Sequence, residues 1–162
     1  MTTWTSSPEA LPRQIAAELA AINLAINQVR TDLALGPGFL PVASARPVST
    51  WAQGTDRLPG LNVYLNGSPE TESQIYTCRD LVLPLTLDLR YQLHDHSLSE
   101  LHGHAYARAL IGYLDYQQHH GSYPGIWHLE AERGGVELED EDNKIYLTVV
   151  EAEARLRVTR RI

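Results

Sequence analysis

The feature that most constrains the fold is a run of alternating residues over positions 81–93. Apolar side chains occupy every odd position, and mostly polar ones stand between them. Successive side chains of a strand point to opposite faces of a sheet, so this pattern predicts one long strand with a buried face and a polar face. The apolar positions are Leu81, Leu83, Leu85, Leu87, Leu89, Tyr91 and Leu93. Pro84 places the early part of the strand at a sheet edge or a bulge, because proline cannot donate to a ladder.

An amphipathic helix is predicted before this strand. Apolar residues recur at spacings of four and three over positions 11–33, which indicates one helix of about 25 residues. Its stripe is Leu11, Ile15, Leu19, Ile22, Ile26, Val29 and Leu33. Ser6 or Ser7 can cap its start, and Gly36-Pro37-Gly38 ends it. We expect this helix either to lie on the sheet or to be shared between subunits.

A second helix and further strands complete the predicted order. The helix covers Leu98 to Tyr116, with Ser97 and Glu100 as a capping box. The predicted strands cover 61–65, 126–129, 134–138 and 145–158, and 36–60 is a long loop with room for one edge strand. Strands that come in runs favour an α+β domain, here a mostly antiparallel sheet with the two helices packed on it and protruding loops. One such domain is expected over 1–162.

Composition narrows the function classes. The chain has 43% hydrophobic and 20% charged residues, which is typical of a folded globular protein. Cys78 is its one cysteine, so no internal disulfide forms and a reducing, intracellular origin is expected. No secretory signal is evident and no run reaches the roughly 20 apolar residues of a membrane span, so we expect no membrane partner. A net charge of −7 argues against gripping nucleic acid.

Opposite charges gather at the two ends of the last predicted strand. The acidic cluster surrounds the hairpin turn 139–144 and comprises Glu137, Glu139, Asp140, Glu141 and Asp142. The basic end comprises Arg155, Arg157, Arg160 and Arg161. A head-to-tail contact can pair the acidic end of one copy with the basic end of the next, and closure of that contact gives a ring. The alternative is that these charges only solvate a turn and a tail.

Three further residues are candidates for contacts. Trp51 lies in the long loop, where an aromatic side chain either anchors an interface or packs on its own domain. Asp88 and Arg90 fall on the polar face of the long strand, where they pair across subunits or meet water.

The histidines raise a competing hypothesis from another class. His94 and His96 are two apart at the end of the long strand, so they would share a face and could present two imidazoles to one metal ion. Asp95, His102 or His104 could add ligands. However, His102 and His104 point to nearly opposite sides of a helix, and the chain has no H-E-x-x-H motif. No phosphate-binding loop is present either, so we expect no cofactor and no catalytic residues.

The element order and a few short phrases resemble a known family. These short segments are Arg46-Pro47, Leu58-Pro59-Gly60-Leu61-Asn62-Val63-Tyr64 and Arg79-Asp80-Leu81-Val82-Leu83. They lie between the long helix and the second helix, and the final strand pair follows the second helix. In these the chain resembles the tail terminator, or tail completion, proteins of long-tailed bacteriophages. The likeness covers most of the chain, although the chain is longer than compact members of that family.

The resemblance implies a structural virion protein and no enzyme. Such a subunit forms a homo-hexameric ring on the tail tube, ends tube growth and joins the tail to the connector or stopper of the head, at the neck of a particle assembled in the host cytoplasm. Its partners are the tail tube protein, the head connector and, in contractile tails, the sheath, while DNA passes through the lumen. Extended loops reach into neighbouring subunits, here 36–60, 66–77 and 139–144. Another neck or head-completion ring protein is the nearest alternative.

Overall fold

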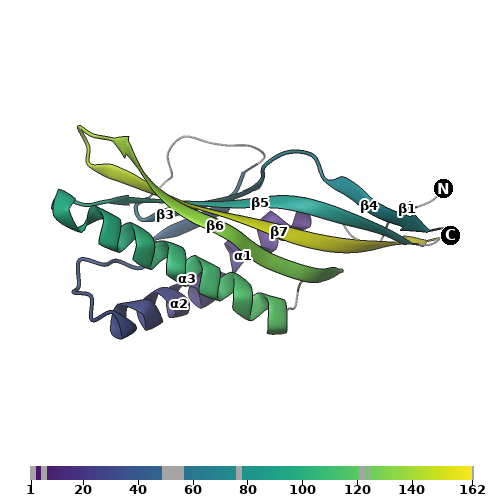
Figure 1. The fold of residues 1–162 in the computed structure, drawn as a ribbon, viewed down its shortest axis with the longest axis horizontal. Coiled ribbons are helices and arrows are strands. Elements are labelled where there is room, and N and C mark those ends of the chain that lie inside the picture. Colours follow the sequence, from purple (N-terminus) through teal and green to yellow (C-terminus); the bar gives the residue numbers. More distant parts are fainter. Residues whose placement is uncertain are drawn as a thin grey trace.

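The computed structural model describes residues 3–4, 7–48, 57–75, 78–120, 123 and 125–161. Within these residues, three α-helices, one short 3-10 helix and seven strands form a mixed α+β fold (Figure 1). In chain order they are β1 (Thr3–Trp4), α1 (Ala10–Ala17), α2 (Leu19–Asp32), β2 (Ser44–Pro47), β3 (Gly60–Leu65), β4 (Glu70–Ile75), β5 (Cys78–Gln92), η1 (His96–Leu98), α3 (Ser99–His120), β6 (Ile126–Asp140) and β7 (Ile145–Arg161).

One sheet contains all seven strands, and β5 and β7 form its centre. These two strands pair antiparallel over their full shared length, from the Cys78–Thr159 pair to the Gln92–Ile145 pair. On the outer side of β7 lie β6 and, at the far end, β1. On the outer side of β5 lie β3 and β4, and β2 then adds to β3 as the one parallel strand of the described sheet. The predicted mostly antiparallel sheet is confirmed.

The alternation that predicted β5 is also confirmed. Its odd-numbered side chains from Leu81 to Tyr91 are at most 4% exposed and belong to the core. β5 is not an edge strand, because β7 pairs with one of its sides and β3 and β4 pair with the other. The carbonyl of Pro84 accepts from Asn66 N at 2.7 Å, at the place where β3 has ended and β4 has not begun. In an antiparallel strand, the N–H and C=O groups of one residue point to the same side. The backbone N–H that Pro84 lacks would therefore point into the gap between β3 and β4.

The predicted long N-terminal helix is wrong in one respect, because it is divided into α1 and α2 at Glu18. Glu18 leaves helical geometry at φ −96° and ψ 36°. Its half-buried carboxylate accepts hydrogen bonds from the Tyr113 and Tyr123 hydroxyls and from Gln117 Nε2. These partners lie about a hundred residues away, so no local pattern indicates the break. The apolar stripe still faces the core on both sides of it.

The second helix is confirmed, with a different start. The 3-10 turn η1 precedes α3, and Asp95 caps it by accepting from Ser97 N at 3.0 Å. Ser97 is therefore not the cap that the capping-box pattern indicated. The hydrogen bonds from Ser97 also lower the pKa of Asp95. The Ser97 hydroxyl also donates to Asp95 Oδ1, at 2.6 Å, so this serine is a donor to the cap.

The predicted loops are less open than expected. Residues 39–42 pack on α2, with Phe39 and Val42 buried in the core. Asn23 binds both backbone groups of Val42, at 2.8 and 3.0 Å, and Arg30 Nε donates to the Phe39 carbonyl. Part of 66–77 is not a loop at all, because β4 pairs with β5. The expected edge strand in 36–60 is present as β2.

The strands predicted over 126–129 and 134–138 are one strand, β6. It contains register shifts between 126 and 128, 131 and 133, and 138 and 140. Bulges of this kind suit an edge strand, because they disturb the row of unpaired backbone groups.

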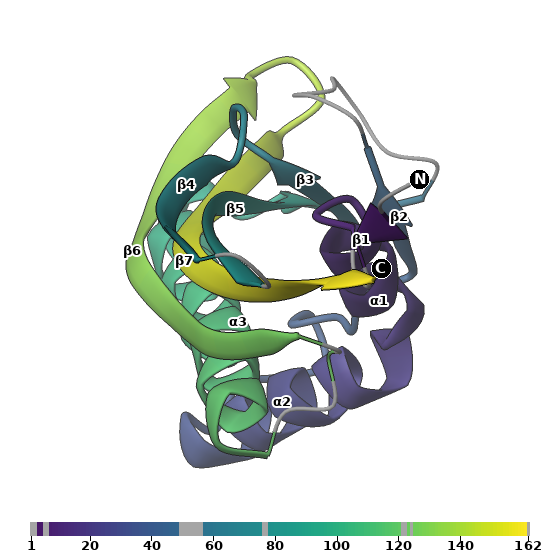
Figure 2. The same cartoon turned by 90° about the vertical axis from the view of Figure 1, so that its right-hand side faces the viewer.

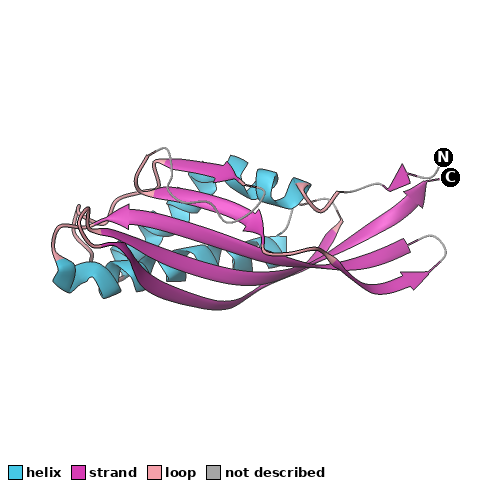
Figure 3. Cartoon of the chain, turned by 90° about the horizontal axis from the view of Figure 1, so that it is seen from above, coloured by secondary structure: helices cyan, strands magenta, loops and turns pink. Residues whose placement is uncertain are grey.

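The sheet is longer than its helical layer. Figure 3 shows the helices beside one part of the sheet, while the strand ends near the termini extend beyond them. Seen along its length, the sheet is strongly curled (Figure 2). The polar face turned away from the helices is also buried near its middle, where Asn62, Thr86, Asp88 and Arg90 are at most 2% exposed. The sheet therefore has two buried faces, the apolar face under the helices and the middle of this polar face.

Candidate functional site

The two predicted charged clusters lie at opposite ends of β7. This strand runs without interruption through 17 residues, from the acidic turn to the basic end. At about 3.3 Å per residue its ends are roughly 50 Å apart. The acidic turn and the basic end of one chain therefore cannot meet, and Figure 1 shows the two ends at opposite extremes of the molecule.

The acidic turn has a rigid base and an exposed tip. Asn143 donates from its backbone N and from Nδ2 to the carboxylate of Asp140, at 3.1 and 2.8 Å. These bonds lower the pKa of Asp140 and keep it charged. Glu141 and Asp142 are exposed and make no ion pair within the part of the chain that the structure describes. They are the acidic groups of the turn best placed to bind another molecule.

Glu139 has a different role from the one its place in the cluster indicated. Both carboxylate oxygens accept from Arg90 Nε, at 2.8 and 2.9 Å. Arg90 is 1% exposed, so this ion pair is buried on one side and connects β5 to the end of β6. The expectation that Arg90 pairs across subunits or meets water is wrong, because its partner belongs to the same chain.

Asp88 is likewise buried within the chain. It is 1% exposed, and its Oδ2 accepts from the Tyr64 hydroxyl at 3.2 Å. Burial raises the pKa of Asp88, while the bond from Tyr64 and the charge of Arg90 act in the opposite direction. The neighbouring pair, Arg46 Nε to Asn62 Oδ1 at 2.9 Å, extends this polar layer to β2. The polar face near the middle of the sheet is thus an internal network and not a contact surface.

The basic end is built from ion pairs on the same face of the sheet. Arg157 donates through Nε and Nη2 to the two oxygens of Asp80, at 2.8 and 3.1 Å. Arg155 Nε donates to Glu153 at 2.9 Å. Two-point binding by a carboxylate fixes the plane of the guanidinium group. The backbone positions of the other two predicted arginines, 160 and 161, complete β7, and their side chains lie outside the described part of the structure.

Trp127 is the contact candidate that the sequence did not indicate. Its indole ring lies beside both arginines, with the Cζ atoms of Arg155 and Arg157 at 5.6 and 5.7 Å from the ring centroid. The register shift between Ile126 and His128 makes Trp127 the extra residue of a bulge. Trp127 is 46% exposed. Trp51, the tryptophan singled out from the sequence, lies outside the described residues.

The structure does not bring the predicted histidine pair together on a strand. β5 ends at Gln92, so His94 lies in a bend and His96 begins η1. His96 Nδ1 is 2.6 Å from the Tyr146 hydroxyl. His102 is buried against Phe39, with ring centroids 5.4 Å apart, and burial lowers the pKa of its imidazole. No group of three or more His, Cys, Asp or Glu residues among those described could hold a metal ion.

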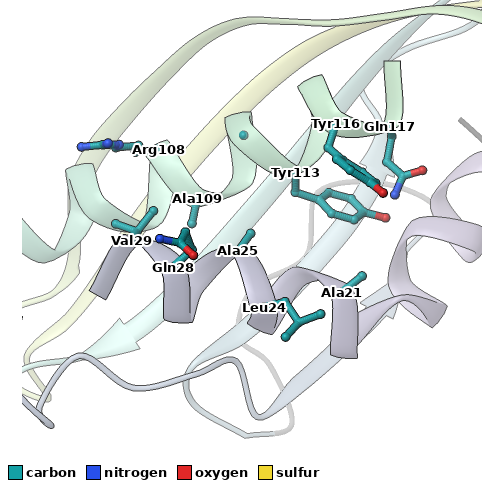
Figure 4. A pocket seen from close by; sticks show the side chains of 11 residues that line it. Ala21, Leu24, Ala25, Gln28, Val29, Arg108, Ala109, Tyr113, Tyr116 and Gln117 are labelled. Carbon is teal, nitrogen blue, oxygen red and sulfur yellow. The ribbon is translucent and has the colours of Figure 1, made fainter. Parts of the chain in front are cut away.

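An apolar groove runs between α2 and α3, with a volume of about 660 Å³ (Figure 4). Small residues, Ala21, Ala25, Ala109 and Gly112, line it, and Leu24 and Tyr116 stand beside them, 70% and 59% exposed. The described residues that line the groove include no carboxylate, histidine or cysteine. Such a lining favours contact with apolar groups over acid-base or metal chemistry.

Comparison with known proteins adds little to this picture. No family model matches the sequence, and no curated protein matches it. Among solved structures, the chain is similar to a chain of one described as "Virion of native gene transfer agent (GTA) particle". The TM-score is 0.37 and the identity 13%, over 81% of this chain and 91% of that one. Neither a family nor a function follows from a likeness of this size. No helix in the described residues is both long enough and apolar enough to cross a bilayer.

Proposed function

We propose that this protein is a structural subunit of a phage-like virion, a tail terminator that assembles into a homo-hexameric ring. In this role the ring caps the tail tube at the head-tail junction, ends tube growth and joins the tail to the head connector. Its partners are further copies of itself, the tail tube protein, the connector or stopper and, in a contractile tail, the sheath. The proposal is supported by the succession of helix, strands, helix and strands, which the fold keeps with its first helix divided into α1 and α2.

One observation carries the proposal. The exposed acidic turn and the basic end lie at the two ends of one continuous strand, β7, too far apart to neutralise each other within a chain. A surface that is complementary to a different surface of the same molecule favours head-to-tail contacts, and such contacts form a ring when their rotation closes. The net charge of −7 suits a ring whose lumen lets DNA pass without binding it.

A charge-exchange experiment tests head-to-tail assembly. One variant reverses the tip of the acidic turn (Glu141→Lys, Asp142→Lys), and another reverses the basic end (Arg160→Glu, Arg161→Glu). Two copies of the same variant would bring like charges together at the contact, so each variant alone should stay monomeric. Mixed in equal amounts, they should form rings in which the two variants alternate, because every contact then joins opposite charges. Native mass spectrometry reads both subunit number and composition.

A control variant carries the same change in charge away from the two ends. Glu100→Lys with Glu132→Lys reverses two exposed carboxylates and should assemble like the unaltered chain. Circular dichroism melts verify that all three variants fold. If the unaltered chain gives no ring with or without tail tubes, the proposed function is wrong. If the single charge variants assemble normally, the charged contact is wrong.

A second experiment separates a terminator from other neck rings. Purified tail tube protein is allowed to polymerise while the ring protein is added at increasing concentration. A terminator should shorten the tubes in proportion to its concentration and bind at one tube end, as seen by electron microscopy. Binding to the head connector with no effect on tube length would assign the chain to the neck or head-completion class.

A further inference from the structure

We propose that Trp127 anchors the surface that receives the acidic turn of a second copy, and that Leu138 of that copy packs on its indole ring. This inference rests on the proposed head-to-tail assembly. It adds an apolar centre to a contact that would otherwise consist of charges alone. Such a centre matters because exposed ion pairs contribute little free energy, whereas buried aromatic anchors dominate many interfaces.

The receiving surface combines an exposed ring with oriented cations. Trp127 is 46% exposed, although tryptophan is on average a highly buried residue. The guanidinium groups of Arg155 and Arg157 flank it at 5.6 and 5.7 Å. Asp80, with a side chain only 15% exposed, binds Arg157 through both carboxylate oxygens, while the Arg157 side chain stays 56% exposed. A guanidinium has five N–H donors, so Arg157 can bind a second carboxylate while Asp80 keeps it in place.

The formal charge of this end is positive. In the last seven residues of β7, from position 155 to 161, four are arginines and none is acidic. Asp80 and Glu153 are the carboxylates that bind Arg157 and Arg155. A ligand for this surface should therefore be acidic at its rim and apolar at its centre.

The acidic turn of another copy has those properties. Leu138 is 47% exposed at the end of β6, next to the exposed Glu137 and close in sequence to Glu141 and Asp142. An exposed leucine with acidic residues close to it in the chain is complementary to an indole ring flanked by guanidinium groups. Within one chain the two surfaces lie at opposite ends of β7, so only a second copy can bring them together.

Site-directed cross-linking tests the pairing. In a Cys78→Ser background, one variant carries Trp127→Cys and a second carries Leu138→Cys. A short bis-maleimide reagent should bridge the two variants when they are mixed, and neither alone should give dimers. Leu101→Cys is the matched control, since Leu101 is 46% exposed but lies on α3. Mixed with the Trp127→Cys variant, it should give no more than background cross-linking.

Equilibrium measurements on the same contact give a second readout. Trp127→Ala and Leu138→Ala should each weaken self-association about tenfold or more, and the double variant should be no weaker than the worse single one. Leu101→Ala should leave association unchanged. Rings that form without selective bridging of 127 to 138, or with additive losses in the double variant, would overturn this inference and leave the proposed ring intact. A chain that never self-associates would overturn both.

Discussion

Arg90 donates from Nε to both carboxylate oxygens of Glu139, at 2.8 and 2.9 Å, across 49 positions of sequence. The pair ties the central strand β5 to the end of β6, immediately before the acidic turn. Arg90 is 1% exposed and the Glu139 side chain 26% exposed, so this carboxylate balances a guanidinium charge that has little access to water. Glu139, which the sequence placed in the acidic cluster, therefore serves to hold two strands of its own chain together.

Removing Glu139 should destabilise the protein much more than removing its neighbours. Glu139→Ala removes the carboxylate that accepts from the buried Arg90 and balances part of its charge, so we expect a loss of about 2–4 kcal/mol in the free energy of unfolding. Glu141→Ala, which removes an exposed carboxylate, should change it by less than about 0.5 kcal/mol. Urea unfolding measures both. Equal effects of the two substitutions would show that the Arg90–Glu139 pair contributes no stability.

Asp88 should make the protein less stable as the pH rises. Its pKa is raised by burial in the folded chain, whereas the unfolded chain keeps the ordinary value of about 3.8. Below that value both states hold the proton and the group has no effect. Above it the unfolded state releases its proton first, so the folded state loses relative stability until the pH passes the folded pKa.

Asp88→Asn removes this loss while its amide oxygen can still accept from Tyr64. The variant should therefore gain stability relative to the unaltered chain between about pH 3.5 and about pH 7. Urea unfolding at both pH values gives the difference. A variant that instead loses relative stability over this range would mean that the charged form of Asp88 is favoured by the fold.

Glu18 should be essential to the junction of α1, α2 and α3. Tyr113 and Tyr123 are buried, and their hydroxyls both donate to its carboxylate. Burial is the main reason that the pKa of each tyrosine is raised. The two hydroxyls also bond to each other, so Glu18→Ala leaves one of the two donors without an acceptor and should cost about 1–3 kcal/mol.

Glu100→Ala serves as the comparison, because Glu100 is an exposed glutamate in the first turn of α3. It should cost only a few tenths of a kcal/mol. Thermal unfolding followed by circular dichroism compares the two variants. If the Glu18→Ala and Glu100→Ala variants have the same melting temperature, the tyrosine hydroxyls have found other partners and the junction does not depend on Glu18.

Two glycines of α3 should respond in opposite directions to alanine. A Cβ on Gly103 would lie 2.6 and 2.7 Å from the methyl carbons of Val136 and 2.7 Å from the Tyr91 hydroxyl. Gly103→Ala should therefore destabilise the protein by about 1–3 kcal/mol through overpacking. A Cβ on Gly112 meets nothing within 4 Å, so Gly112→Ala should stabilise it by about 1 kcal/mol through helix propensity. Melting temperatures of the two variants that shift in the same direction would contradict the packing of α3 on β6.

The two glycines also show how far sequence reasoning reaches. Both fall within the predicted helix of 98–116, and no pattern in the chain distinguishes them. Gly103 is needed because α3 approaches β6 there, a contact between segments about thirty positions apart. Trp127 is a similar case, since its position beside two arginines depends on a bulge that no residue type marks.

Local periodicity was sufficient to predict a helix or strand wherever its own side chains form a buried face. The alternation of β5 and β7 and the apolar stripe of α1 and α2 follow from spacing of two or of three and four residues. The separation of the acidic and basic clusters follows from their order along the chain. The α+β class follows from the order of these elements. The prediction of one unbroken N-terminal helix failed because the stripe continues across Glu18 while the backbone does not.

The sequence by itself determined which residues are apolar, which are charged and how often each recurs, and thereby the strands, the helices and the two charged ends. Only the tertiary structure decided which of those charged side chains form ion pairs within the chain. Glu139 and Arg157 have partners within the chain, while Glu141 and Asp142 make no ion pair among the described residues. The physical reason is that an ion pair depends on distance in space, and the partners of Glu139 and Arg157 are 49 and 77 residues away.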